Sequence, residues 1–172
     1  MKTGGNRYGT HRVIEPKGVL PQPARVIDND MEIWDNELKL DVIRLNVDSA
    51  SFHQIKTKLE KQGHTDLEKA FADHVIDLTS RTGKHKNEDT GSGGMLIGVV
   101  KEIGPNFEMK ETIKVGDKVA SLVSLSLTPL KVNEVKKVYL DKDQVEIDGE
   151  AILFSSGIYA KLPDDMNENL AL

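Results

Sequence analysis

The stretch LKLDVIRLNV at residues 38–47 decides the fold class, because its apolar side chains recur with the two-residue period of a β-strand. Partway along the stretch, the alternation changes phase by one residue. The apolar positions of the two phases are Leu38, Leu40 and Val42, followed by Ile43, Leu45 and Val47. A change of phase inside a strand indicates a β-bulge. We therefore expect a long, bulged strand here.

Two helices are predicted after this strand. The first ends at Gly63, and the second begins at Thr65, which forms a T-x-x-E capping box with Glu68 and is followed, past the helix end, by Gly83. Their apolar stripes are Phe52, Ile55 and Leu59 in the first helix, and Leu67, Phe71, Val75 and Leu78 in the second. The polar, glycine-rich residues 83–94 predict a loop.

The remainder of the chain is β-rich. Residues 95–103 predict a strand that ends in a turn at 104–106, and residues 119–127 predict a strand with one apolar and one serine-lined face. Shorter strands are predicted around Val132 and at 138–140, 145–147, 151–154 and 158–161. Many short strands with turns between them are typical of a partly open β-barrel. The expected fold is mainly β, with two helices inserted after the first long strand.

Composition excludes several classes of protein. The 172 residues include no cysteine, which rules out disulfides, thiolate zinc clusters and a thiol nucleophile. A net charge of −5 argues against a nucleic-acid-binding role. No apolar run is long enough to span a membrane, and the N-terminus lacks the apolar stretch of a signal peptide. We expect a soluble, cytoplasmic protein that binds neither nucleic acid nor membrane.

Residues 1–24 contain four glycines and three prolines and predict an extended arm rather than a helix. Basic side chains outnumber acids in this region, where Glu15 is the single acid among the first 25 residues. The basic residues are Lys2, Arg7, Arg12, Lys17 and Arg25. Such a segment could hold an anionic substrate group or a dinucleotide phosphate, or it could be a solvated arm that packs on a partner subunit.

Three motifs occur in order along the chain: GVVKEIG at 98–104, VGDKV at 115–119 and IYAKLPDDMNENLAL at 158–172. Together they resemble the GroES-like catalytic domain of the medium-chain dehydrogenase/reductase superfamily. The resemblance implies an extended N-terminal arm at 1–24, a GroES-like catalytic domain at 25–161, and the start of a linker to a nucleotide-binding domain at 162–172. It also implies an NAD(P)-dependent oxidoreductase.

Two further segments, GNRYGTHRVIEPKGVLPQPA at 5–24 and TGSGGMLIG at 90–98, resemble a narrower family, the diaminohexanoate dehydrogenases of lysine fermentation. This resemblance implies oxidative deamination of 3,5-diaminohexanoate, a small amino-acid substrate. Two other interpretations stay open. One is a GroES-like module used for binding or assembly without enzymatic activity, and the other is a zinc-free quinone or enoyl reductase of the same superfamily.

Zinc-using members of the superfamily carry Gly-His-Glu before the strand that GVVKEIG resembles, and a cysteine after the first long strand. The matching residues here are Gly93, Gly94 and Met95, and Ser49, Ala50 and Ser51. The five histidines, His11, His53, His64, His74 and His85, show no recognisable spacing of a ligand pair. The resemblance therefore predicts a domain without catalytic zinc or another metal.

Without zinc, hydrogen-bond donors must stabilise the reacting carbonyl or iminium, and side chains must move protons. Ser49, Ser51 and His53 fall where the relatives keep their proton-relay residues, so the resemblance makes them candidate catalytic residues. The alternative is that the serines cap the helix that follows. Ser92 is a candidate substrate-binding residue, and the alternative there is a plain flexible loop.

No G-x-G-x-x-G follows a predicted strand, and the GSGG at 91–94 precedes a strand rather than a helix. We therefore expect the chain alone neither to bind NAD or NADP with useful affinity nor to be active. The resemblance implies that a nucleotide-binding domain, in cis or in trans, holds the cofactor and selects between NAD and NADP. A homo-oligomer is also expected.

Overall fold

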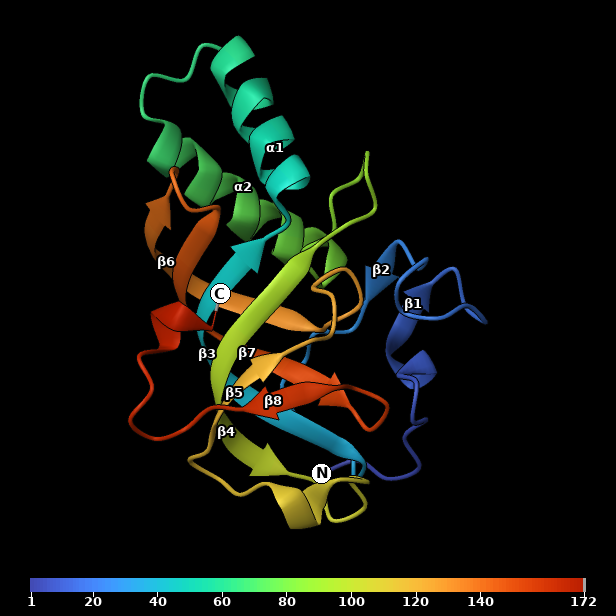
Figure 1. Cartoon of the computed structure of the whole chain (residues 1–172). Coiled ribbons are helices and arrows are strands. Elements are labelled where there is room, and N and C mark those ends of the chain that lie inside the picture. The colour runs from blue at the N-terminus through green and yellow to red at the C-terminus, as the bar shows by residue number, and fades with distance from the viewer. Residues whose placement is uncertain (172) are drawn as a thin grey trace.

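The computed structural model describes residues 1–171 and shows a mainly β chain with two α-helices (Figure 1). The strands are β1 (Val13–Glu15), β2 (Val26–Ile27), β3 (Glu37–Val47), β4 (Gly94–Ile103), β5 (Lys118–Ser121), β6 (Leu130–Tyr139), β7 (Gln144–Phe154) and β8 (Tyr159–Lys161). The helices are α1 (Ser49–Lys61) and α2 (Leu67–Thr82), with short 3-10 helices at Thr10–Arg12, Lys110–Thr112 and Glu168–Leu170. Among the described residues, no helix is long and apolar enough to cross a membrane.

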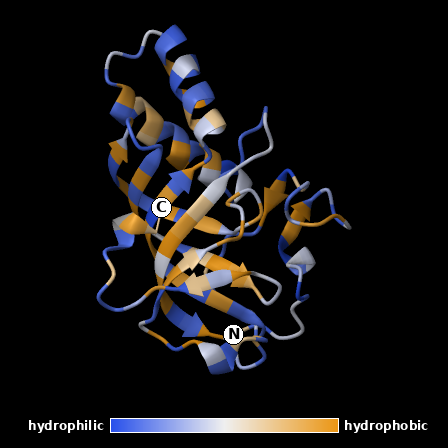
Figure 2. Cartoon of the chain, in the orientation of Figure 1, coloured by the Kyte–Doolittle hydropathy of each residue, from blue (hydrophilic) through white to orange (hydrophobic). Residues whose placement is uncertain are grey.

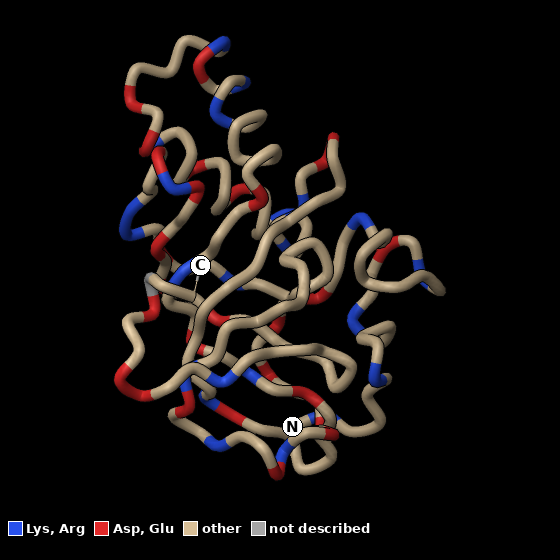
Figure 3. The backbone as a smooth tube through the Cα atoms, in the orientation of Figure 1, with Lys and Arg blue, Asp and Glu red and all other residues tan. Residues whose placement is uncertain are grey.

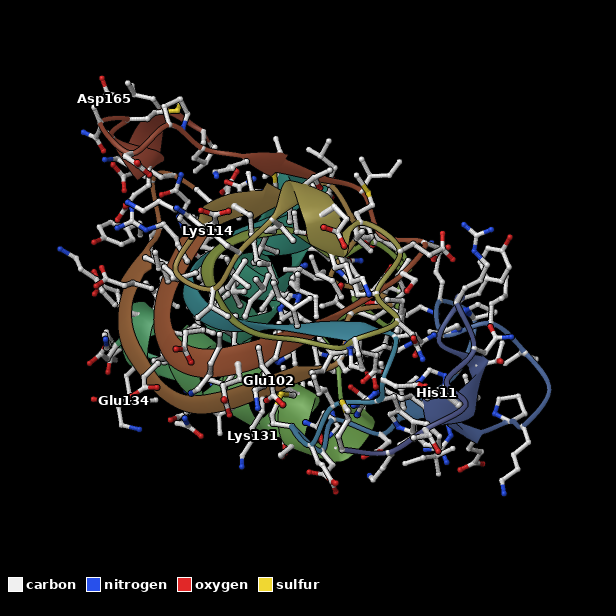
Figure 4. The ribbon with its side chains drawn as sticks, turned by 90° about the horizontal axis from the view of Figure 1, so that it is seen from below. His11, Glu102, Lys114, Lys131, Glu134 and Asp165 are labelled. Atoms are coloured by element: carbon white, nitrogen blue, oxygen red, sulfur yellow. The ribbon has the colours of Figure 1, made fainter. Side chains whose placement is uncertain are left out.

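Six strands form one antiparallel sheet in the order β6-β7-β3-β4-β5-β8. Because β6 and β8 are its edges, the sheet is not closed into a barrel within residues 1–171. Figure 4 shows it curving around the core side chains, with Lys131 and Glu134 of β6 on the outside. The predicted mainly β fold with helices inserted after the first long strand is confirmed. The closure expected of a barrel is not seen, and the GroES-like fold stays a prediction.

Strand β3 lies inside this sheet and contains the predicted bulge. Its register shifts between Val42 and Arg44 against both neighbours, β4 and β7. The extra residue, Ile43, packs with Ile97 and Leu162 in a smaller cluster, separate from the main core that holds the other apolar residues of β3. The sequence pattern suggests that Ile43 begins the second run of core positions, but in the structure its side chain lies outside the main core. The bulge restores the phase that lets both halves of β3 bury their apolar side chains in one core.

Both helices are capped by an aspartate. The Asp48 carboxylate caps α1 by accepting a hydrogen bond from the Ser51 amide at 3.2 Å. The Asp66 carboxylate caps α2 by accepting from the Lys69 amide at 3.0 Å. The predicted capping box that begins at Thr65 is therefore wrong by one residue, and no serine caps α1. A carboxylate suits this position because its negative charge also faces the positive end of the helix.

The helices pack through the predicted apolar stripes. The ring of Phe52 stacks on the ring of Phe71 with 4.2 Å between their centroids, which joins α1 to α2. In Figure 1, α2 lies beside β6, and Figure 2 shows apolar and polar residues alternating in bands along it. Gly63 and Gly83 follow the two helices with φ of 82° and 78°, as expected for glycines that terminate helices.

The strand predicted at 119–127 is wrong beyond Ser121, where β5 ends. The serines bond their own backbone instead: Ser121 Oγ accepts from the Val123 amide at 3.1 Å, and Ser124 Oγ accepts from the Ser126 amide at 3.2 Å. Local bonds of this kind compete with strand pairing. Ser126 is fully buried, so the serines do not form an exposed polar face.

The short strands predicted between 130 and 154 are parts of two long ones. β6 and β7 pair as a hairpin, and the turn between them includes Asp143, whose φ is 56°. The register of β6 shifts between Val132 and Glu134 and again between Val135 and Lys137. Each shift interrupts the alternation of side chains, which explains why the sequence pattern indicates separate pieces.

Residues 1–24 form no α-helix and fold back on the domain, where β1 pairs with β2. Arg12 is fully buried, and its guanidinium donates to both carboxylate oxygens of Glu37 at 2.6 and 2.7 Å. His11, labelled in Figure 4, contacts the same carboxylate at 2.7 Å. Further acceptors of the Arg12 guanidinium are the backbone oxygens of Asp28, Asp30 and Glu32. We name Arg12, His11 and Glu37 the ion-pair cluster, and its arginine is fully engaged within the fold.

Residues 162–171, which the resemblance assigns to the start of a linker, contain the 3-10 helix Glu168–Leu170 and no α-helix. Leu162 and Met166 pack with Ile43, and Lys118 forms an ion pair with Glu168. The segment therefore lies against the sheet.

Candidate active site

Three hydroxyl groups from two distant segments meet beside the first turn of α1. Ser51 Oγ lies 2.5 Å from Ser92 Oγ and 2.9 Å from Thr90 Oγ1, and the last two atoms are 3.0 Å apart. Ser51 is fully buried, Ser92 is half-buried and Thr90 is exposed. We name these three residues the hydroxyl cluster. The structure thus brings together two residues, Ser51 and Ser92, that the sequence singles out.

A carboxylate orients the hydroxyl cluster. Asp48 Oδ1 accepts from the Ser92 hydroxyl at 3.3 Å while it also caps α1. A serine that donates its one hydrogen keeps its oxygen lone pairs for accepting. Asp48 therefore makes Ser92 an acceptor: the Ser51 hydroxyl fills one of its two lone pairs, and the other is left for Thr90 or for a group that approaches the half-buried oxygen.

Ser49 is not part of the hydroxyl cluster. Its hydroxyl donates to Asp143 Oδ2 at 2.5 Å. The backbone oxygen of Asp143 in turn accepts from the Val47 amide at 2.9 Å. Ser49 therefore helps to fasten the β6–β7 turn to the start of α1.

His53 lies on the exposed side of α1, one turn after Ser49. Its ring makes no hydrogen bond or ion pair with any of residues 1–171. The structure therefore leaves His53 accessible but does not connect it to the hydroxyl cluster.

The glycines at the start of β4, Gly93 and Gly94, are required by close packing. A Cβ at Gly94, where φ is 106°, would lie 2.0 Å from the backbone oxygen of Asn46, and a Cβ at Gly93 would lie 2.4 Å from the Ser126 amide nitrogen. A larger residue there would have to move the backbone. Within residues 1–171, no group of three potential ligands among histidine, aspartate and glutamate could hold a metal ion. Catalysis without zinc stays a prediction.

Two buried bases stand at the start of the loop that carries Thr90 and Ser92. The Lys84 ammonium donates to the backbone oxygens of Pro21, Gln22 and Ala24 at 2.5, 3.1 and 2.6 Å. Burial, together with the positive charge of Lys86, lowers the pKa of Lys84 to about 8. His85 is fully buried, and neither ring nitrogen has a partner within residues 1–171. Burial, with a further contribution from His74, lowers the pKa of His85 to about 4.

The junction between β3 and α1 does not fit a dinucleotide phosphate. It runs through Val47 and Asp48 without a glycine, and the Asp48 carboxylate already bonds an amide at the start of α1. A phosphate placed there would meet a like charge. α1 directly follows the long strand β3, and the junction between them lacks the glycines of a phosphate-binding turn.

Sequence reasoning missed Asp48, Thr90 and Asp143. Asp48 could have been found, because an aspartate between a strand and an apolar helical stripe is an N-cap signal. Thr90 and Asp143 gave no such signal, because their roles depend on contacts with α1. Acidic side chains flank the hydroxyl cluster, and Figure 3 shows acidic residues at the tip of the loop between α2 and β4, where Glu88 and Asp89 lie.

Comparison with known proteins places the chain in a class, the N-terminal domains of dehydrogenases. Residues 11–163 match the family described as the L-erythro-3,5-diaminohexanoate dehydrogenase N-terminal domain, and the chain belongs to this family. An L-erythro-3,5-diaminohexanoate dehydrogenase of Fusobacterium nucleatum subsp. nucleatum is 59% identical over 168 residues, and one of Acetoanaerobium sticklandii is 58% identical over 168 residues. Each match covers 98% of this chain and 47% of the relative. The chain thus spans about half the length of these relatives.

Proposed function

We propose that this chain is the substrate-binding part of an NAD(P)-dependent dehydrogenase that oxidatively deaminates 3,5-diaminohexanoate. The family match over residues 11–163 carries this proposal. The hydroxyl cluster supports it, because three neutral oxygens beside a carboxylate are suited to accept hydrogen bonds from an ammonium group. We propose that a nucleotide-binding domain, in cis or in trans, supplies the nicotinamide chemistry, which fits a β3–α1 junction that lacks a glycine-rich turn.

Within this proposal, the hydroxyl cluster acts on the amino group that reacts. Its ammonium form must lose a proton before the neighbouring carbon can give up its hydride, which the oxidised nicotinamide would accept when bound. Water then adds to the resulting iminium of the substrate, which yields a ketone and releases ammonia. Thr90 and Ser92 are the accessible members and would contact the substrate. Ser51 is fully buried, so it would orient these two hydroxyls rather than touch the substrate itself. Asp48, bonded to Ser92, would be the acceptor of the proton.

The charge around the cluster fits a substrate with two amino groups. Asp48 bonds Ser92, Asp89 adjoins Thr90 in the same turn, and Asp143 bonds Ser49 at the start of α1. Carboxylates near a half-open site favour cations and raise their local concentration. We propose that they attract the second ammonium group of 3,5-diaminohexanoate.

The proposal is tested by completing the enzyme with the second half of the Fusobacterium nucleatum relative and following the reduction of NAD or NADP. We expect turnover of 3,5-diaminohexanoate, and a lower kcat/KM for an analogue that lacks the 5-amino group. The isolated chain should bind neither cofactor in calorimetry. A completed, folded enzyme that does not turn over the diamino acid would contradict the proposed substrate.

His53 needs a separate test, because it is accessible but unconnected to the hydroxyl cluster. If it moves a proton in the completed enzyme, His53→Ala lowers kcat by roughly 10²–10⁴-fold. An unchanged kcat would remove His53 from the site.

A further inference from the structure

Asn87 organises the turn that presents Thr90 and Ser92. It is almost completely buried, although it lies in a polar loop. Its side-chain Oδ1 accepts from the Asp89 amide at 2.8 Å and from the Thr90 amide at 3.3 Å. Its backbone amide donates to the backbone oxygen of Ser92 at 2.9 Å, and its backbone oxygen accepts from the Gly91 amide at 2.8 Å. One residue thus closes the turn from both ends.

The same side chain ties this turn to α1. Asn87 Nδ2 donates to Gln54 Oε1 at 2.8 Å. Gln54 follows Ser51 by three residues and therefore lies on the same side of the helix. The loop and α1 are joined at two adjacent points: by the Asn87 amide at Gln54, and by the Ser92 hydroxyl at Ser51. All four polar groups of Asn87 are used in this arrangement.

We propose that Asn87 is a positioning residue that fixes the hydroxyl cluster in its working geometry. The residue does not belong to the cluster and makes no contact with its side-chain oxygens. It acts through the turn, because the amides of Asp89 and Thr90 both donate to one acceptor, the Asn87 side-chain oxygen. This inference rests on the proposed function for its catalytic consequence, but the ordering of the loop is independent of that function.

The first arm of the test measures loop order in the chain itself by amide hydrogen exchange. Asn87→Ala removes the acceptor and should speed exchange at residues 89–92 about tenfold, with α1 unchanged. Asn87→Asp keeps an acceptor oxygen and should restore most of the protection. Asn29→Ala is the matched control, because Asn29 also bridges segments, through the backbone oxygen of Leu130 at 2.9 Å, but lies outside the loop. Equal exchange in wild type and Asn87→Ala would overturn the proposal.

The second arm measures kcat in the completed enzyme with 3,5-diaminohexanoate. Asn87→Ala should lower kcat by roughly a hundredfold, since a small misplacement of reacting groups has an effect of that size. In a Ser92→Ala background, the same substitution should lower kcat no further. Full additivity of the two variants, or an equal loss in Asn29→Ala, would overturn the positioning role.

The two arms separate this proposal from the proposed function. If Ser92→Ala has no effect on kcat, the assignment of the hydroxyl cluster to catalysis fails. In that case faster exchange in Asn87→Ala would still support its hold on the loop. If Ser92→Ala lowers kcat and Asn87→Ala does not, the proposed function stands and the positioning role is wrong.

Discussion

The ion-pair cluster and the hydroxyl cluster join segments that are far apart in the sequence, but they differ in charge and in access to solvent. Arg12 and Glu37 are fully buried, and several hydrogen bonds hold each of them. In the hydroxyl cluster the groups are neutral, Thr90 is exposed, and Ser92, which donates to Asp48 and bonds Ser51, has one lone pair left to accept from Thr90 or from a ligand. A buried, saturated cluster holds the fold together, whereas a half-open one with spare acceptors can receive a ligand. Substitutions in the ion-pair cluster should therefore lower the stability of the fold, whereas substitutions in the hydroxyl cluster should lower kcat and leave stability nearly unchanged.

The largest effect on stability is expected at the ion-pair cluster. Burial alone would raise the pKa of Glu37, but hydrogen bonds from Arg12 and His11 outweigh it and hold that pKa below its ordinary value. Arg12→Met would leave the buried Glu37 charge without its guanidinium, with only His11 and the Trp34 amide as donors, which should lower the free energy of unfolding by about 3–5 kcal/mol in urea titrations. Arg12→Met combined with Glu37→Leu should recover part of this loss. An exposed ion pair contributes at most about 1 kcal/mol. If the free energy of unfolding of Arg12→Met fell by no more than about that amount, the structural role of the ion-pair cluster would be contradicted.

The sequence predicts those features of the fold that depend on the order of apolar and polar side chains along a single element. The bulge in β3 and the apolar stripes of both helices were predictable, because a side chain's place along one element decides whether it is buried. The strand at 119–127 was not, because its serines bond their own backbone. The fragmented prediction for β6 had a similar cause, two register shifts in one strand.

The candidate site was only half predictable. Ser51 and Ser92 stood out through the resemblance, but their meeting depends on the turn that Asn87 closes. The ion-pair cluster left no pattern, because Arg12 and Glu37 are 25 residues apart. Long-range polar contacts of this kind have no period that a sequence could display.

The second largest effect on stability is expected at His85, which is buried like the ion-pair cluster but whose ring nitrogens have no hydrogen-bond partner within residues 1–171. Its pKa falls from 6.5 to about 4, so the folded state favours the neutral ring. This contribution to stability is fully present above pH 6.5 and is lost as the pH falls to about 4. The loss should total roughly 3 kcal/mol. As the pH falls through this window, the free energy of unfolding of wild type should fall relative to that of His85→Leu, and a constant difference between the two would contradict it. His53→Gln, at the exposed surface, is the control.

The smallest effect on stability separates capping from catalysis. Asp48 and Asp66 each cap a helix, and replacing either with alanine should lower the free energy of unfolding by about 1 kcal/mol. Only Asp48 reaches the hydroxyl cluster. Thermal melts should therefore match in the two variants, while kcat of the completed enzyme falls only in Asp48→Ala. Equal rates in both variants would make Asp48 a cap and nothing more.

The central proposal is that Ser92, held between Asp48 and Ser51, is a hydroxyl that contacts the reacting amino group of the substrate. The most direct measurement is kcat of Ser92→Ala in the completed enzyme with 3,5-diaminohexanoate, together with its melting temperature. Ser80→Ala is the matched control, because that serine lies on α2 and donates to the backbone oxygen of Asp77. We predict that Ser92→Ala lowers kcat by roughly 10²–10⁴-fold while it melts close to wild type. A near-normal kcat in Ser92→Ala would contradict the account.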